Sequence, residues 1–382
     1  MILTVLATGL ASVAPAWPLH AQSRLPVERP AFKSSLYRCA IRQDGSLCAG
    51  VRNNGRVELY DADLAKLVEL EPKLDAVCLE LAFSPNGEHL SAQTSDGRLL
   101  LWGVGEAGLE QATLARVITQ LSLDWHRPRS YEAGLTWSPD STRILTIDGL
   151  GHRSLFNAEG DLVRRLNARG YEDGAFDALW HEPTRALLLR DASGVGLYDW
   201  DTGEPRMVGA QHEQYSTAKP PTAFALIPDG SLLAIGSEHL HVDLFDLDTG
   251  ALCAELDYSP GDWLVSEDAH PLQLRFAPDG KQLALSSYGS AYVAVMDSET
   301  LHVTYDSGYR GCHWNEVYQL RWRPTSDRIM CYFDCGSGGT SELTLGEEPK
   351  WQSFDRLVGP RFSATTGVGI LDGELTSWQL FE

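Results

Sequence analysis

Basic residues are scarce in this sequence. Its 382 residues include 31 Lys and Arg against 52 Asp and Glu, which gives a formal net charge of −21. Proteins that bind the phosphate backbone of nucleic acids need a basic stripe that displaces counterions, so we expect no nucleic acid among the partners. The surplus of negative charge favours a basic partner instead.

Long apolar runs and helical periodicity are also missing. No stretch beyond the N-terminus approaches the roughly 18 uninterrupted apolar residues of a membrane-spanning helix, so the sequence predicts no membrane insertion. Helical spacing occurs in one stretch, 109–121, for which an outer strand is the alternative. Hydrophobic residues make up 43% of the chain, which is typical of a soluble globular protein with a full-sized core.

Cysteines are few and dispersed. There are seven, an odd number spread over the whole chain, which is unlike the dense framework of a small disulfide-rich domain. We expect most of them to be buried thiols. Cys331 and Cys335, with Cys312 and His313 nearby in sequence, lack the second ligand pair of a zinc finger, so we predict no metal.

The N-terminus leaves two alternatives open. Its first 23 residues contain no Asp, Glu, Lys or Arg and run from an apolar stretch to Leu-His-Ala ending at Ala21, as in a secretory signal peptide. No basic residue precedes the apolar stretch, and Pro15 and Pro18 would break a helix there. Residues 1–22 are therefore a cleaved signal peptide or contain a strand that closes the fold, and 23–382 form one domain. A cleaved signal peptide would imply a periplasmic or secreted protein, and a closing strand would imply a cytoplasmic one.

A turn pattern recurs along the chain with a period of about 45 residues, which is typical of propeller blades. Proline fixes φ at one position of such a turn, and Asp, Asn and Gly tolerate the positive φ that follows. The clear copies are FSPNG (83–87), WSPDS (137–141), IPDG (227–230) and FAPDG (276–280). Weaker copies are RQDG (42–45), WHEPT (180–184) and WRPTSD (322–327).

Each copy predicts four antiparallel strands. A short apolar strand precedes the proline turn, and a strand of small and branched residues follows it. A third strand ends in an aromatic residue and Asp, as at Tyr60-Asp61 and Tyr198-Asp199. Asp-Thr-Gly turns at 201–203 and 248–250 then lead to an outer strand.

These turns and strand ends resemble the WD-repeat family over roughly 36–382. The resemblance is degenerate: Trp102 alone supplies the usual strand-end Trp, and Gly103 replaces the Asp that follows it. The Gly-His dipeptide is missing from most copies, so the buried His–Ser–Asp–Trp network of that family is not expected here. The resemblance implies an all-β fold, a β-propeller of four-stranded antiparallel blades.

Eight inner strands can be counted, so we predict eight blades rather than seven. The eighth lacks the proline turn and ends on its third strand, so we expect an N-terminal strand, at 2–6 or 23–28, to close the ring and cover the sheet edge. The predicted inner strands start near Leu36, Leu79, Gly134, Ala178, Ala223, Leu272, Val317 and Val358.

The loops predict a binding face. Proline turns lie on one face of a propeller, around Pro85, Pro139 and Pro278, and the connections between blades lie on the other. The connections are long and rich in Trp, Tyr and Arg, the residues that dominate interface energetics. We therefore predict a non-enzymatic scaffold that binds a protein or peptide there. The predicted binding residues are Trp125, His126, Arg129, Tyr131, Tyr215, Trp263, Tyr309, Arg310 and Trp314.

Catalysis finds little support in the sequence. No nucleophile elbow of the G-x-S-x-G kind is present, and we predict neither a catalytic residue nor a cofactor. The alternative is a secreted or periplasmic propeller that binds or hydrolyses a lactone-like or sugar-like ligand through acidic residues at the channel mouth. Its candidate residues are Asp148, Asp191, Glu238 and Asp334.

Overall fold

The computed structural model describes most of the chain beyond residue 34. The described residues are 35–104, 113–118, 134–147, 153–166, 178–181, 186–191, 194–208, 221–258, 271–287, 292–307, 317–333, 339–346, 348–355, 357–362, 366–371 and 374–379. They form strands β1 to β31 and a short 3₁₀ turn, η2 (Glu238–Leu240). The predicted all-β class is confirmed.

In the part of the chain that the structure describes, seven sheets have four strands each, hydrogen bonded antiparallel and in chain order, and a last sheet has three. The first sheet is β1 (Leu36–Ile41), β2 (Leu47–Arg52), β3 (Val57–Asp61) and β4 (Lys66–Leu70). The second is β5 (Cys78–Phe83), β6 (His89–Thr94), β7 (Leu99–Gly103) and β8 (Thr113–Ile118). The third is β9 (Leu135–Trp137), β10 (Arg143–Ile147), β11 (Arg153–Asn157) and β12 (Leu162–Leu166). The fourth is β13 (Ala178–His181), β14 (Ala186–Asp191), β15 (Gly194–Asp199) and β16 (Pro205–Val208).

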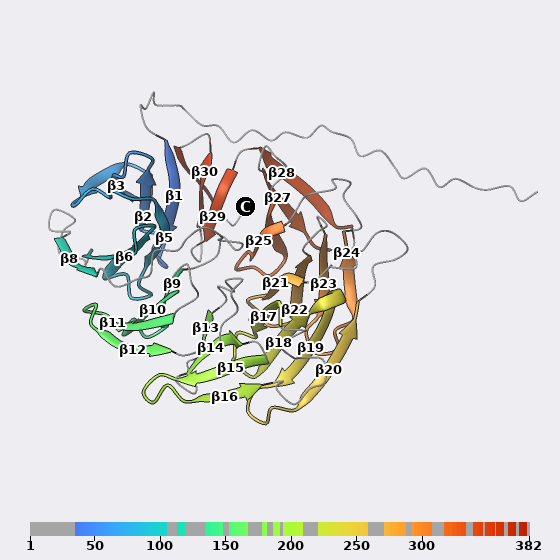
Figure 1. The fold of residues 1–382 in the computed structure, drawn as a ribbon. Helices are drawn as coiled ribbons and strands as arrows, with labels where there is room; N and C mark the ends of the chain where they lie inside the picture. The colour runs from blue at the N-terminus through green and yellow to red at the C-terminus, as the bar shows by residue number, and fades with distance from the viewer. Residues whose placement is uncertain are drawn as a thin grey trace, which may run out of the picture.

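The fifth sheet is β17 (Ala223–Leu226), β18 (Leu232–Ser237), β19 (His241–Asp246) and β20 (Leu252–Asp257). The sixth is β21 (Pro271–Phe276), β22 (Gln282–Ser287), β23 (Val293–Asp297) and β24 (Val303–Asp306). The seventh is β25 (Val317–Trp322), β26 (Arg328–Phe333), β27 (Gly339–Thr344) and β28 (Lys350–Asp355). The last sheet is β29 (Leu357–Phe362), β30 (Thr366–Leu371) and β31 (Glu374–Gln379). Figure 1 shows the sheets arranged around a ring.

The predicted turn chemistry operates as expected. Between β21 and β22, Asp279 Oδ1 accepts a hydrogen bond from the backbone N–H of Lys281 at 3.0 Å. Gly280 adopts φ 74° and donates its N–H to the carbonyl of Ala277 at 2.9 Å. A residue with a Cβ is strained at this φ, so glycine favours the reversal that follows the proline.

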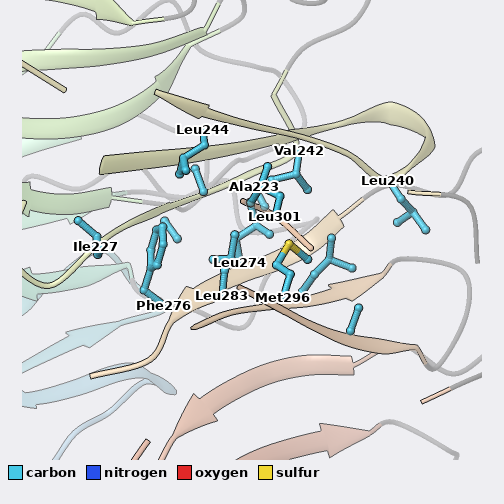
Figure 2. Close-up of a cluster of buried hydrophobic side chains, with 14 of the residues drawn as sticks. Ala223, Ile227, Leu240, Val242, Leu244, Leu274, Phe276, Leu283, Met296 and Leu301 are labelled. Carbon is cyan, nitrogen blue, oxygen red and sulfur yellow. The ribbon is translucent and has the colours of Figure 1, made fainter. Parts of the chain in front are cut away.

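Apolar side chains pack between successive sheets rather than within one. Figure 2 shows such a cluster between the fifth and sixth sheets, where Val242 and Leu244 meet Leu274 and Met296. Successive residues of a strand point to opposite faces, so the fifth sheet also packs Leu233 against the fourth sheet. Both faces of these sheets are therefore buried, which explains why their second strands are rich in small and branched residues.

The stretch with helical spacing is a strand in part. Residues 113–118 form β8, the outer strand of the second sheet, so the alternative of an outer strand is confirmed. Among the described residues, no helix is long and apolar enough to cross a membrane.

Most of the described cysteines are buried, as predicted: Cys39, Cys48, Cys78 and Cys331 are buried, while Cys253 is exposed. Burial raises the pKa of Cys48 and of Cys78 to about 12, so both remain protonated thiols at neutral pH.

The last sheet joins the seventh differently from the way the other sheets are joined. Only residue 356 separates β28 from β29, whereas residues 71–77 separate β4 from β5. Moving from the outer to the inner edge of a four-stranded sheet covers about 14 Å at the usual strand spacing. Two residue steps reach at most about 7 Å. The start of β29 therefore lies nearer the outer edge of the seventh sheet than the first strands of the other sheets lie to the outer edges of the sheets before them.

Candidate partner-binding face

Strand direction sorts the loops onto two faces. Because the strands of a sheet alternate in direction, the turns after the first and third strands lie on one side, which we call the proline-turn face. The loop after the second strand and the connection to the next sheet lie on the opposite side, the inter-blade face.

The proline-turn face is tied together from turn to turn. Ser141 and Ser326 stand where other copies have glycine, and both adopt φ 62°. The Oγ of Ser141 accepts a hydrogen bond from the backbone N–H of Asn86 at 2.9 Å, and that of Ser326 accepts one from Asp279 at 3.0 Å. Each bond joins two successive sheets, so these turns have a structural role.

Arginines make the same kind of link at the outer turns of this face. Arg164 of β12 donates from Nη2 to the carbonyl of Asp201 in the next sheet at 2.7 Å. Arg206 of β16 donates to the carbonyl of Leu247 in the sheet after that at 2.6 Å. These polar groups are used to connect neighbouring sheets.

The predicted binding residues lie outside the described residues, so their positions in the fold remain predictions. They are Trp125, His126, Arg129, Tyr131, Tyr215, Trp263, Tyr309, Arg310 and Trp314. The described part of the inter-blade face lies at the strand ends next to these connections.

A histidine bridges two carboxylates at the inter-blade end of the fifth sheet. His241 donates from Nε2 to Asp243 Oδ1 at 2.8 Å and from Nδ1 to Asp257 Oδ1. Asp243 is fully buried, whereas the side chain of Asp257 is 89% exposed. The hydrogen bond to Asp243, supported by the bond to Asp257, raises the pKa of His241 to about 9. The imidazolium therefore balances a buried carboxylate at neutral pH and holds an exposed one in place.

The turn before this histidine has an unusual backbone. His239 and Leu240 adopt φ 57° and 59° in η2, in the left-handed region that residues with a Cβ rarely occupy. Leu240 is buried in the cluster between the fifth and sixth sheets, and His239 is exposed. Burial of Leu240 offsets the strain, so the turn holds the His239 side chain at the surface.

A pair of tyrosines continues the described rim toward the sixth sheet. Tyr258 packs on Tyr292 with ring centroids 5.6 Å apart, and its hydroxyl donates to Asp306 Oδ2 at 2.5 Å. Burial, together with the bond to Asp306, raises the pKa of Tyr258. The half-buried ring of Tyr258 and the exposed carboxylate of Asp306 are thus fixed relative to each other.

The connection between the first and second sheets has a different character. It spans residues 71–77 and contains no aromatic residue. Leu74 is buried, and the carbonyl of Glu71 accepts a hydrogen bond from Trp102 Nε1 at 2.8 Å. This connection joins two sheets and packs onto them without any aromatic residue. Linking two sheets therefore does not by itself require the aromatic residues of the longer connections.

The side chains of the acidic residues proposed for a channel mouth lie outside the described residues, so their arrangement remains a prediction. Glu238 begins η2 of the fifth sheet and Asp191 ends β14 of the fourth, while Asp148 and Asp334 lie outside the described residues. Among the described side chains, no group of His, Cys, Asp and Glu could hold a metal ion. Cys331 is buried in β26, and Cys312, His313 and Cys335 lie outside the description.

Sequence reasoning missed the cluster of His241, Asp243 and Asp257. One signal was present: Asp243 lies between Val242 and Leu244 in a strand with both faces buried, where an ionised carboxylate requires a partner. His241 lies two positions away on the same side of that strand, so the pair could have been predicted from alternation.

No protein-family model matches the chain. Solved structures do: Sqt1 from Chaetomium thermophilum bound to the N-terminus of the ribosomal protein L10 matches with a TM-score of 0.65 and 15% identity, covering 91% of this chain and 97% of that one. A structure of Chaetomium thermophilum Sqt1 alone matches with a TM-score of 0.66 and 14% identity, over 91% and 96% of the two chains. The fold is a β-propeller. At this identity the similarity concerns the fold of the propeller, which the strand pattern had predicted.

Proposed function

We propose that this propeller is a non-enzymatic scaffold that binds a protein or peptide through its inter-blade face. The observation that carries the proposal is the similarity to Sqt1, which was crystallised with the N-terminus of a ribosomal protein and matches over nearly the full length of both chains. Propellers have many different functions, so the similarity in fold supports this function only together with the local features of this chain.

The character of the two faces supports the choice of face. The proline-turn face uses Ser141, Ser326, Arg164 and Arg206 to hold neighbouring sheets together. The inter-blade face has long connections with Trp, Tyr and Arg, and its described rim presents exposed Asp257 and Asp306, held by His241 and Tyr258. Fixed aromatic and polar side chains suit an interface because little conformational freedom is lost on binding.

The partner that we propose is basic. The net charge of −21 attracts a positively charged protein and speeds its encounter with the propeller. Such attraction is screened by salt, so association should slow as ionic strength rises.

We further propose eight blades, with the last blade completed by an N-terminal strand. Within the described residues the last sheet has three strands, one fewer than the other seven, and β1 contacts all three of them. A fourth strand at the edge of β31 would cover backbone groups that otherwise invite pairing with other chains. Residues 2–6 and 23–28 are the two candidates for that strand.

The proposal is tested by capturing partners from the native host with the full-length chain, followed by calorimetry with each purified partner. We expect a protein or peptide with net positive charge that binds with a defined stoichiometry. Retention of small molecules only, with no protein that binds in calorimetry, would contradict the scaffold and favour the ligand-binding alternative.

A further inference from the structure

Val77 is a strongly exposed apolar residue on the inter-blade face. Its side chain is 58% exposed, and it lies in the connection between the first and second sheets. The other large apolar side chains that are exposed among the described residues lie on the outer strands β4, β12 and β20, and they are Leu67, Leu162, Val163 and Leu252. Single apolar residues are ordinary on a protein surface, so the surroundings of Val77 decide whether it has a role in binding.

The backbone of Val77 is held by both neighbouring sheets. Its N–H donates to Ser95 Oγ at 3.2 Å, and the N–H of Ser95 donates to the carbonyl of Val77 at 2.8 Å. The N–H of the next residue, Cys78, donates to the hydroxyl of Tyr37 in the first sheet at 2.7 Å. Valine is also stiff at χ1, so a contact with the Val77 side chain costs little conformational freedom.

A different residue of the same connection packs the fold. Leu74 is 3% exposed and belongs to the apolar cluster between the first and second sheets, and its N–H donates to the carbonyl of Gly55 at 2.8 Å. Val77 is not among the described members of that cluster. The exposed methyl groups of Val77 therefore contribute little to the stability of the propeller.

A negative charge lies beside Val77. Asp75 is exposed, two positions before Val77 in the chain. The charges of Glu71 and Lys73 in the same connection cancel, so Asp75 makes the connection acidic. The nearby loop after β6 adds no further net charge, because its Asp96 is paired with Arg98 of the same loop at 2.6 Å.

An apolar contact beside a carboxylate suits a segment in which an apolar side chain is next to lysine or arginine. The apolar side chain can cover Val77, and the long stem of the basic residue can lie over apolar surface while its charge faces Asp75. A segment rich in acidic residues is repelled by Asp75 and by the net charge of −21.

We propose that Val77 and Asp75 form a contact site for an extended segment of a basic partner protein. An apolar side chain of that segment packs on Val77, and a neighbouring lysine or arginine pairs with Asp75. The inference rests on the proposed binding through the inter-blade face, and it names a part of that face and the side chains of the partner that meet it. Tyr37 and Ser95 are positioning residues.

Two labelled peptides of equal charge and length test the site on the full-length chain by fluorescence anisotropy, one with alternating Leu and Lys and one with alternating Ser and Lys. We expect the wild type to bind the Leu–Lys peptide about tenfold more tightly, as burial of one apolar side chain provides. Val77→Asp should abolish this preference. Val163→Asp makes the same change at an exposed valine of β12, so it is the matched control and should keep the preference.

A second pair of variants tests the carboxylate. Asp75→Asn should weaken binding of the Leu–Lys peptide about threefold at low ionic strength, and the difference should disappear in high salt. Asp63→Asn removes an equal charge from an exposed position on the proline-turn face and should have a smaller effect. All four variants change exposed side chains, so their melting temperatures should match that of the wild type.

The proposal is overturned if the wild type binds both peptides equally, if Val77→Asp keeps the preference, or if Asp63→Asn weakens binding as much as Asp75→Asn. Calorimetry with a captured partner separates this inference from the scaffold function. A partner that binds the wild type and Val77→Asp equally well overturns the inference and leaves the scaffold standing, whereas the lack of any protein that binds the wild type overturns both.

Discussion

The backbone N–H of Asn86 donates a hydrogen bond to Oγ of Ser141, 55 positions further along the chain, at a distance of 2.9 Å. Ser141 adopts φ 62°, a conformation that favours glycine, in a turn where other copies have glycine. The backbone strain at Ser141 is therefore offset by a hydrogen bond that links two sheets.

Ser141→Ala should destabilise the fold by about 1 kcal/mol, because it keeps the strain and loses the partly buried hydrogen bond from the backbone N–H of Asn86. Ser141→Gly is the matched control: it also loses the bond but relieves the strain, so its cost should be smaller. Urea unfolding of both variants measures the difference. Equal stability of the two variants would show that strain at this position has no energetic weight.

Trp102 should be a principal anchor of the second sheet. Its side chain is fully buried, and its Nε1 donates to the carbonyl of Glu71 at 2.8 Å. We expect Trp102→Ala to cost about 3–5 kcal/mol through the cavity that it leaves. Trp102→Phe should cost less, about 1–3 kcal/mol, mainly by leaving that carbonyl without its donor. Thermal unfolding followed by calorimetry separates the two, and a Phe variant as unstable as the Ala variant would contradict this account.

The stability of the propeller should depend on pH through His241. Its pKa is about 9 in the folded protein, against about 6.5 in an unfolded chain. The folded state therefore holds a proton that the unfolded state releases, and the resulting stabilisation is complete below pH 6.5. It is lost as the pH rises from about 6.5 through 9.

Unfolding free energies of the wild type and of His241→Gln, measured from pH 6 to pH 9.5, check this prediction. We expect the advantage of the wild type over the variant to shrink as the pH rises. A constant difference across that range would mean that Asp243 and Asp257 do not raise the pKa of the imidazole.

Partner binding should depend on the inter-blade face. We expect Trp263→Ala or Trp314→Ala to weaken binding by about 2 kcal/mol or more, as truncation of an interface anchor does, with little change in melting temperature. Glu88→Ala and Lys281→Ala, both exposed on the proline-turn face, are the controls and should bind normally. Calorimetry with the captured partner measures all four, and loss of binding only in the two controls would assign the interface to the other face.

Removal of residues 376–382 should impair the fold. The deletion takes most of β31, so β30 becomes an exposed sheet edge. We expect aggregation or loss of cooperative unfolding, measured by light scattering and thermal denaturation. A truncated chain that melts like the full one would contradict the closure that we propose.

Strand positions could be predicted closely because local chemistry fixes them. The first strands begin at Cys78, Leu135 and Pro271, one residue from the positions expected, because the proline turns that follow set their ends. The helical spacing of 109–121 was ambiguous since a strand with alternating exposure can contain the same apolar positions.

The contacts between sheets could not be predicted in the same way. Trp137 Nε1 donates to Ser91 Oγ, 46 positions away, and Trp322 Nε1 donates to the carbonyl of Arg275, 47 positions away. Local periodicity carries no information about such pairs.

Because neighbouring sheets contact each other through particular side chains, each repeat of this propeller fits only its own position in the ring. Trp180 of the fourth sheet donates to Thr136 of the third at 3.3 Å, and His181 lies 3.1 Å from the carbonyl of Gly230 in the fifth. Exchanging the fourth repeat for a copy of the fifth would therefore disturb two neighbours as well as the repeat itself. A substitution in one repeat requires a compensating substitution in the neighbouring repeat that it contacts. The repeats can therefore diverge from a shared consensus sequence while the side chains between neighbouring sheets remain complementary.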